Sequence, residues 1–193
     1  MNRDEAWQIL CEYTKGEPLR KHGLAVEAAM RAYARKLGGD VETWGIVGLL
    51  HDFDFEMHPT AAEHPAKGAP ILRERGVPEE IVHAVLCHAP YLEELGVQRE
   101  NDMDRAIFAV DELAGFVIAV TLVRPNKSID EVDVRAVRKK MKDKGFARTA
   151  NREDITGGAE VLGVDLDEHI AFVIESLKPV AGELGIGGVA NSK

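Results

Sequence analysis

Trp44-Gly45-Ile46-Val47-Gly48-Leu49-Leu50-His51-Asp52 is the stretch that decides the fold. Residues 44–50 are apolar or small around the whole circumference of a helix, which is typical of a helix buried on all sides. Two ionisable side chains end that helix. A buried carboxylate needs a cation or a metal ion beside it, because desolvating an unpaired ion costs several kcal/mol. We therefore predict a central buried helix that ends at a site built around His51 and Asp52.

Apolar residues recur at helical spacing along almost the whole chain, and no segment combines clean alternation with β-branched residues and hairpin turns. We therefore predict an all-α fold, a single compact helical bundle. Gly and Pro residues lie at the expected ends of its helices. The predicted helices span residues 4–14, 18–37, 41–53, 65–75, 79–89, 103–123, 130–144, 151–162 and 166–184.

The length of 193 residues suits one domain with a hydrophobic core, and nothing in it demands a second. We expect this domain to span residues 1–185, with its motif-bearing part in 18–123. Residues 186–193 lack apolar periodicity, and we expect them to form a flexible tail.

The net charge is −9, from 24 Lys and Arg against 33 Asp and Glu, so no overall positive field attracts a polyanion. We expect no duplex nucleic acid partner. A protein of this charge that handles phosphate must supply positive charge locally, through metal ions or a few placed basic side chains.

The longest apolar stretches are shorter than the ~20 residues that span a bilayer, and residues 1–5 do not lead into a signal-peptide apolar region. We therefore expect no membrane span and a cytoplasmic location. The two cysteines, Cys11 and Cys87, form no disulfide framework, and Cys87 fits a small buried hydrophobe. The sequence leaves the oligomeric state open.

Two further ionisable residues lie on apolar helix faces. His22 shares a face of the 18–37 helix with Val26 and Met30, so it points inward. A single inward histidine is more often a satisfied core residue than a metal ligand. Asp111 lies in the apolar stripe of the 103–123 helix, where a helix cap or an Arg partner is the alternative. Together with the His51-Asp52 pair, both residues favour a shared metal site.

Two more histidines are candidate ligands. His88 lies on the inner face of the 79–89 helix, whereas His83 lies on its outer face. His64 opens the string His64-Pro65-Ala66-Lys67-Gly68-Ala69, in which Pro fixes the entry into a helix. His58, which precedes a proline in a turn, is the alternative to His64. We predict that His64 and His88 complete a second metal position.

The chemistry of this donor set is coherent. Imidazole nitrogen with carboxylate oxygen suits Mn, Fe, Co, Ni or Zn better than Ca or Mg, and the set can hold one or two ions. For these residues a structural zinc site is disfavoured, because such sites are usually closed by four Cys or His ligands and this set is rich in carboxylate and lacks Cys. Divalent ions activate water near neutral pH and polarise a phosphoryl oxygen, so hydrolysis of a phosphate ester is the natural use.

Two residues near the His-Asp pair are candidates for catalytic work. Asp54 is predicted to orient the water or protonate the leaving oxygen, with Glu56 as its substitute and an exposed loop aspartate as the alternative. Lys67 is predicted to contact the phosphate, with a solvated helix-face lysine as the alternative.

The order His22, His51-Asp52, Asp111 on separate helices resembles the HD-domain superfamily of metal-dependent phosphohydrolases, over residues 18–123. The extra histidines resemble the subset that binds two metals. The resemblance implies that Asp52 bridges the ions, with His22, His51 and Asp111 on one ion and His64 and His88 on the other.

The chain also departs from the common pattern of this superfamily. Phe53-Asp54-Phe55-Glu56 follows the pair where many members carry Ile-Gly-Lys or a nearby glutamate, so the resemblance implies no particular substrate. We predict a metal-dependent phosphohydrolase that acts on a phosphomonoester or phosphodiester, with a small nucleotide as the favoured substrate. The competing prediction is a non-catalytic module that senses a nucleotide or only holds a metal.

Overall fold

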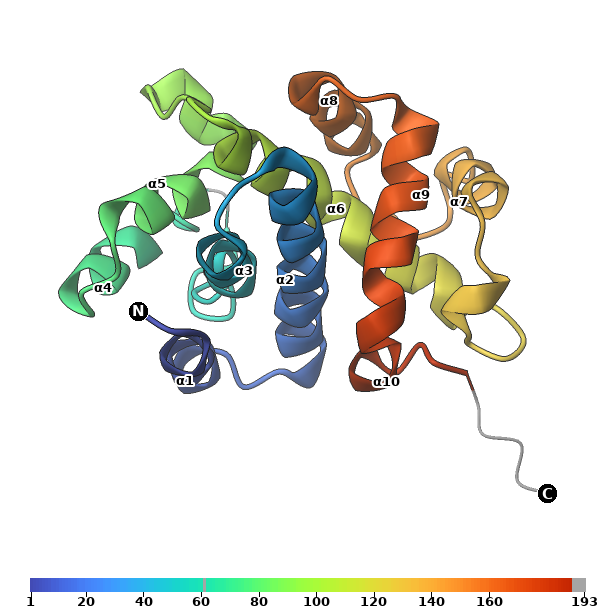
Figure 1. The fold of residues 1–193 in the computed structure, drawn as a ribbon, viewed down its shortest axis with the longest axis horizontal. Coiled ribbons are helices and arrows are strands. Elements are labelled where there is room, and N and C mark those ends of the chain that lie inside the picture. The colour runs from blue at the N-terminus through green and yellow to red at the C-terminus, as the bar shows by residue number, and fades with distance from the viewer. Residues whose placement is uncertain (61, 189–193) are drawn as a thin grey trace.

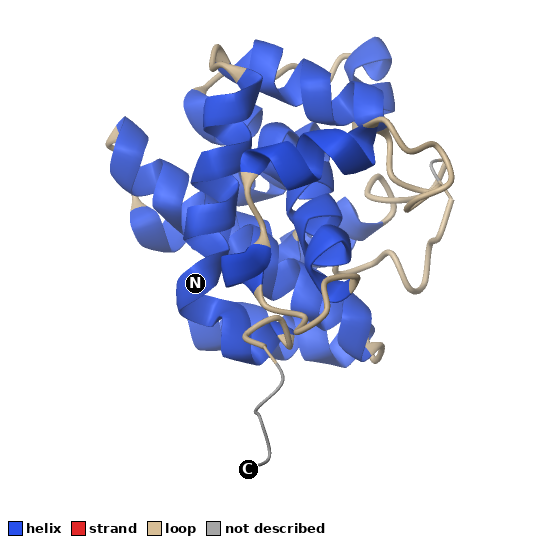
Figure 2. Ribbon diagram, turned by 90° about the vertical axis from the view of Figure 1, so that its right-hand side faces the viewer, coloured by secondary structure: helices blue, strands red, loops and turns tan. Residues whose placement is uncertain are grey.

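The computed structural model describes residues 1–60 and 62–188, and helices make up nearly all of their regular structure (Figure 2). Within these residues the only β pairing is an isolated antiparallel bridge between Ser128 and Gly187. The fold is therefore all-α, as the apolar spacing predicts. The α-helices are α1 (Arg3–Tyr13), α2 (Glu17–Leu37), α3 (Val41–Leu50), α4 (Gly68–Glu74), α5 (Glu79–Cys87), α6 (Asp102–Leu122), α7 (Val134–Met141), α8 (Arg152–Leu162), α9 (Leu166–Leu177) and α10 (Ala181–Leu184). Short 3-10 helices are η1 (Pro90–Leu95), η2 (Ile129–Glu131) and η3 (Lys178–Val180).

Helix α3 lies at the centre of one half of the molecule, as its apolar circumference requires. It packs against α1, α2 and α5, and every residue from Trp44 to Leu50 is buried. Figure 1 shows α3 nearly end-on beside α2, with α6 passing behind α2. Helix α2 also contacts α6 and α9, so it links α3 to both of these helices. Side chains from α2, α3 and α6 therefore meet in the interior.

Side-chain caps fix where the site-bearing helices begin. The Asp40 carboxylate accepts a hydrogen bond from the Thr43 backbone at the start of α3. Asn101 and Asp104 form a reciprocal capping box at the start of α6. Because each cap satisfies backbone N–H groups that the first turn leaves free, the register of both helices is set from their N-termini.

The structure shortens several predicted helices. Helix α3 ends at Leu50, and residues 51–57 continue as hydrogen-bonded turns. Helix α4 begins at Gly68 rather than at residue 65. The predicted 166–184 helix is divided into α9, η3 and α10, because Pro179 has no N–H to continue the helical hydrogen bonds. Helix η1 was absent from the sequence prediction.

The packed part of the chain extends past the predicted boundary at residue 185. Ile186 is fully buried, and its carbonyl accepts a hydrogen bond of 2.8 Å from the Ile129 N–H. This corrects the predicted start of the tail, since one buried apolar residue creates no periodicity that a sequence pattern can reveal. Residues 189–193 of the predicted tail lie outside the described residues. No helix in the described ranges is both long and apolar enough to cross a membrane.

Candidate metal centre

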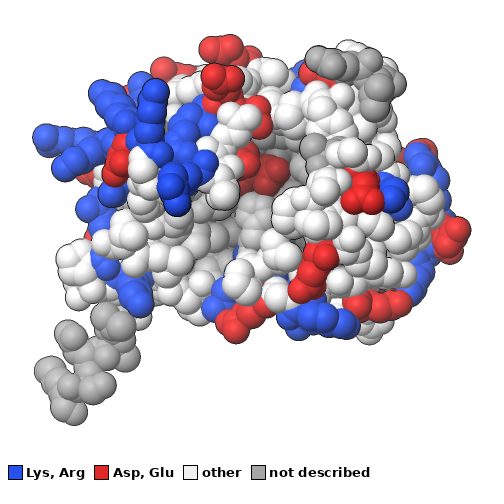
Figure 3. Space-filling model, turned by 180° about the vertical axis from the view of Figure 1, so that it is seen from behind, with Lys and Arg blue, Asp and Glu red and all other residues white. Residues whose placement is uncertain are grey.

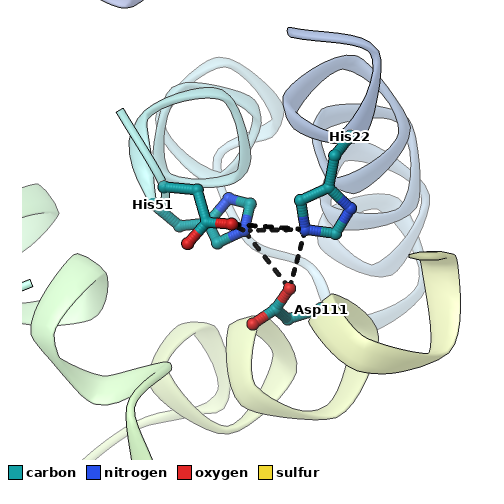
Figure 4. Close-up of side chains that lie close together, drawn as sticks. His22, His51 and Asp111 are labelled. Carbon is teal, nitrogen blue, oxygen red and sulfur yellow. Dashed lines mark hydrogen bonds and ion pairs between the residues drawn. The ribbon is translucent and has the colours of Figure 1, made fainter. Parts of the chain in front are cut away.

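Four ionisable side chains from three parts of the chain meet in the interior. His22 comes from α2, His51 follows the end of α3, and Asp111 comes from α6 (Figure 4). Asp52 directly follows His51 in the chain. His22 Nε2 lies 2.9 Å from Asp111 Oδ1 and 3.1 Å from His51 Nε2. Asp52 Oδ2 lies 3.5 Å from His51 Nε2 and 3.7 Å from His22 Nε2. The four donor atoms lie within 4.8 Å of one another, so these residues, which we name the first cluster, can share one ion.

The other oxygen of Asp52 faces a second cluster. Asp52 Oδ1 lies 2.9 Å from His64 Nε2 and 3.6 Å from His88 Nε2. The two imidazole nitrogens are 3.0 Å apart. The second cluster is therefore Asp52, His64 and His88, and the Asp52 carboxylate is common to both clusters.

Hydrogen bonds on the far side of three rings fix which imidazole nitrogen faces the clusters. His51 Nδ1 donates to the Gly48 carbonyl at 2.8 Å, and His88 Nδ1 donates to the Val85 carbonyl. His64 Nδ1 donates to Asp54 Oδ1 at 2.6 Å. Since a neutral imidazole carries one proton, each ring in its neutral form presents the Nε2 lone pair to the cluster, as a metal ligand must.

Burial and mutual charge shift the titration of both clusters. Burial alone would lower the pKa of His51, but the carboxylates of Asp52 and Asp111 raise that pKa well above its ordinary value. Burial likewise opposes ionisation of Asp111, yet His51 and His22 hold its pKa below the usual range. Desolvation and the neighbouring His51 lower the pKa of His88 to about 4. The carboxylates therefore remain anionic in the interior, where a cation would stabilise them.

Asp54 lies behind the second cluster and not beside its open side. Its side chain is fully buried, and its carboxylate reaches the ring nitrogen of His64 that points away from Asp52. A Cβ at Gly68 would lie 2.5 Å from Asp54 Oδ2, so the start of α4 packs directly on this carboxylate. This position suits a residue that orients His64 better than one that orients water, so the water-orienting role of Asp54 stays a prediction.

Asp54→Asn should therefore weaken ion binding at the second cluster by roughly 10–100-fold, because the loss of the negative charge lowers the basicity of His64. Affinity at the first cluster should stay unchanged. Calorimetric titration with Mn²⁺, which separates the two binding steps, checks this expectation. If the variant lowers the turnover rate and leaves both affinities intact, Asp54 handles a proton after all.

Lys67 also lies outside the site. Its ammonium forms an ion pair of 2.5 Å with Glu63, one helical turn away, and more than half of its side chain is exposed. Lys67 does not line the cavity at the clusters, so the structure does not bring it to the place where the sequence predicts a phosphate contact. Lys67→Ala therefore serves as the matched control for the Asp54 variant.

The two substitutes named from the sequence lie elsewhere as well. Glu56 is exposed and accepts hydrogen bonds from the backbone N–H groups of Lys15 and Gly16. His58 belongs to neither cluster among the described residues.

A cavity of about 510 Å³ opens onto both clusters. Figure 3 shows the hollow on this face, with acidic side chains at its base. Five cluster residues form part of its lining, and no Lys or Arg is found among the described residues that line it. The rest of the lining is mainly aromatic, small or acidic: Phe55, Ala89, Pro90, Tyr91, Phe108, Glu112, Gly115, Phe116, Ala119, Ala147, Thr149, Ala150 and Asp154.

Sequence reasoning missed the polar residues of this lining that lie outside the clusters: Tyr91, Glu112, Thr149 and Asp154. Glu112 lies next to Asp111 in the chain, and burial together with the Asp111 charge raises its pKa to about 7. Its place beside an inward aspartate was a signal that could have identified it. The Tyr91 hydroxyl is buried and has no hydrogen-bond partner among the described residues. Tyr91 lies on η1, which no sequence pattern indicated.

Comparison with known proteins adds independent information. The HD-domain family model matches residues 19–115, about half of the chain, and this range contains every residue of both clusters. A ribonuclease Y from Symbiobacterium thermophilum is 28% identical over 139 residues, which cover 72% of this chain and 26% of that protein. The chain thus spans about a quarter of the length of this relative. No solved structure matches the present chain significantly.

Proposed function

Because the chain belongs to the HD-domain family, we propose that it is a metal-dependent phosphohydrolase that cleaves a small phosphate ester, with a nucleotide as the favoured substrate. The observation that carries this proposal is the pair of donor clusters that share Asp52 at a cavity. A cavity of about 510 Å³ lies within the usual size range of small-molecule sites.

The clusters fit divalent transition metals. Ligands at about 2.0–2.3 Å from one ion lie about 3–4 Å apart in tetrahedral or octahedral geometry. The donor contacts quoted above, from 2.9 to 3.7 Å, fall in or next to this range. The first cluster would hold one ion and the second cluster the other, with Asp52 between them. When bound, such ions lower the pKa of water and neutralise the charge that develops on a phosphoryl group.

The cavity lining indicates how the chain would bind the rest of a substrate. Since the described lining contains no Lys or Arg, the negative charge of a phosphate would be matched at the two clusters. Phe55 and Phe108 contribute aromatic side chains to the lining, against which a base can pack. Glu112 and Asp154 offer carboxyl oxygens to hydroxyl or amino donors. Together these features favour a nucleotide over a simple sugar phosphate.

A phosphodiester in RNA is the second candidate substrate, favoured by the similarity to a ribonuclease Y. The net charge of −9 and the absence of basic side chains from the described lining favour the small ester, because binding to an RNA backbone depends on Lys and Arg contacts.

Metal-loaded protein should release phosphate from, or open, a small nucleotide. The expected result with Mn²⁺, Co²⁺ or Ni²⁺ is turnover of at least one member of a panel of nucleoside monophosphates, cyclic nucleotides, dinucleoside polyphosphates and short RNA. Chelator-treated protein should be inactive and should recover when the metal is restored. If the metal-loaded protein binds a nucleotide tightly and turns over none of the panel, the chain is a sensor and not a hydrolase.

A further inference from the structure

A third group of ligand-type side chains lies apart from the two clusters. His83 and Cys87 lie one turn apart on α5, and Asp104 lies in the first turn of α6. A ligand atom of each lies within 4.8 Å of the others. The carbonyl of Gln98, from the segment that joins these helices, also faces the group. None of these residues lines the cavity at the first and second clusters.

The donor atoms of this third cluster have the spacing of a metal site. His83 Nε2 lies 3.0 Å from the Gln98 carbonyl oxygen and 3.4 Å from Cys87 Sγ. Asp104 Oδ2 lies 3.5 Å from His83 Nε2, and Cys87 Sγ lies 3.4 Å from the Gln98 oxygen. Four ligands around one tetrahedral ion, at about 2.0–2.3 Å from it, are expected about 3.3–3.8 Å apart. The contacts of the first cluster span a similar range, from 2.9 to 3.7 Å.

Hydrogen bonds alone leave this cluster incompletely satisfied. Asp104 is fully buried, and its Oδ2 accepts hydrogen bonds from the backbone N–H groups of Glu100 and Asn101. Its Oδ1 is buried and has no partner among the described residues. A buried unpaired carboxylate oxygen costs stability. A cation held against this carboxylate would offset that cost.

We propose that His83, Cys87, Asp104 and the Gln98 carbonyl form a structural zinc site. A thiolate with an imidazole selects zinc over the harder divalent ions, since sulfur is a soft ligand. The Cys87 thiol gives up its proton to water when it binds the ion. Four protein donors close the coordination sphere, and a closed sphere is the mark of a structural ion and not of a catalytic one.

Such an ion would stabilise the segment of the chain that forms one side of the cavity. The site joins α5 to the start of α6 through Gln98, and the segment between them contains η1 with Tyr91, which lines the cavity. His88 directly follows Cys87 at the end of α5. Loss of the ion would therefore loosen the part of the chain that positions the second cluster. The proposal is independent of the proposed hydrolase activity.

Cobalt substitution tests the site selectively. A thiolate bound to Co²⁺ gives a near-ultraviolet charge-transfer band, and neither the first nor the second cluster contains sulfur. We expect the Co²⁺-loaded protein to show this band and Cys87→Ser to lose it. Zinc content of Cys87→Ser should fall by about one ion per chain. The matched control is Cys11→Ser, which removes the other cysteine and should keep both the band and the zinc.

A second variant keeps the test decisive if Cys87→Ser folds poorly. His83 is about 30% exposed, so His83→Gln should leave the core intact. It should release zinc to a chelator at least about 10-fold faster than the unaltered protein, since one of four ligands is lost. A band that is missing from the Co²⁺-loaded unaltered protein, or that survives in Cys87→Ser, would overturn the proposal. Unchanged zinc release from His83→Gln would do the same.

Discussion

Asp52→Ala is expected to abolish ion binding at both clusters and to lower the proposed phosphohydrolase activity by on the order of 10³-fold or more. Asp52 Oδ2 faces the histidines of the first cluster, and Asp52 Oδ1 faces those of the second. No other residue contributes to both clusters among those the structure describes. Its removal therefore takes one ligand from each ion and the negative charge that holds the two ions together.

The fold should survive this substitution, because removing a buried charge also removes its desolvation cost. Metal analysis after dialysis measures the loss of the ions, and circular dichroism measures the helix content. The matched control is Asp130→Ala, an exposed aspartate on η2, which should keep its metal and its activity. Full metal occupancy in Asp52→Ala would refute a bridging role, and loss of only one ion would confine Asp52 to one cluster.

The first cluster could be predicted because each member is anomalous within its own helix. His51 and Asp52 end an apolar helix, and Asp111 interrupts the apolar stripe of another. The sequence alone therefore shows that burying these ionisable side chains costs free energy unless they have a partner. The structure brings these residues together with His22. The helical periodicity that predicts the core thus also predicts which ionisable residues face it.

The segment between α3 and α4 could not be predicted in the same way. Residues 51–57 and 62–67 form turns, and turns have no period from which the direction of a side chain follows. Asp54 and Lys67 both lie there, and the structure places neither side chain on the open side of the clusters. The Asp54 carboxylate packs against Gly68 at the start of α4, a contact that no helical pattern contains. Such contacts exist only after the chain has folded.

The third cluster escaped prediction for a related reason. The sequence places His83 on the outer face of its helix, and its side chain is indeed partly exposed. The apolar and polar faces of one helix do not indicate which residues of other segments lie beside it. They therefore do not identify Asp104 or the Gln98 carbonyl as neighbours of His83. Cys87 fits a buried hydrophobe by its sequence neighbours. Only the folded chain places the Gln98 carbonyl and the Asp104 carboxylate near its sulfur.

The contact between α6 and α8 gives the second large effect, and two adjacent glycines of α8 allow it to be isolated. A Cβ at Gly158 would lie 2.7 Å from Ala109 Cα, which is backbone of α6 and cannot rotate away. A Cβ at Gly157 would meet no described atom within 4 Å. Gly158→Ala is therefore expected to destabilise the fold by about 1–3 kcal/mol through overpacking. Gly157→Ala should stabilise it by about 0.5–1 kcal/mol through higher helix propensity.

Gly158→Ala and Gly157→Ala add the same methyl group to the same helix. The expected changes in the free energy of unfolding have opposite signs, so the comparison isolates the contact between α6 and α8. Thermal unfolding measures the difference, at roughly 2–4 °C for each kcal/mol in a protein of this size.

Helix α8 also carries Asp154, and its N-cap Asn151 donates a backbone hydrogen bond of 3.1 Å to Glu112, so a displaced α8 would move two polar residues of the cavity. Gly158→Ala should accordingly raise the KM for the substrate while the metal content stays constant. Equal stability of the two variants would show that α8 can withdraw from α6 without cost, and the close approach would then have no role in shaping the cavity.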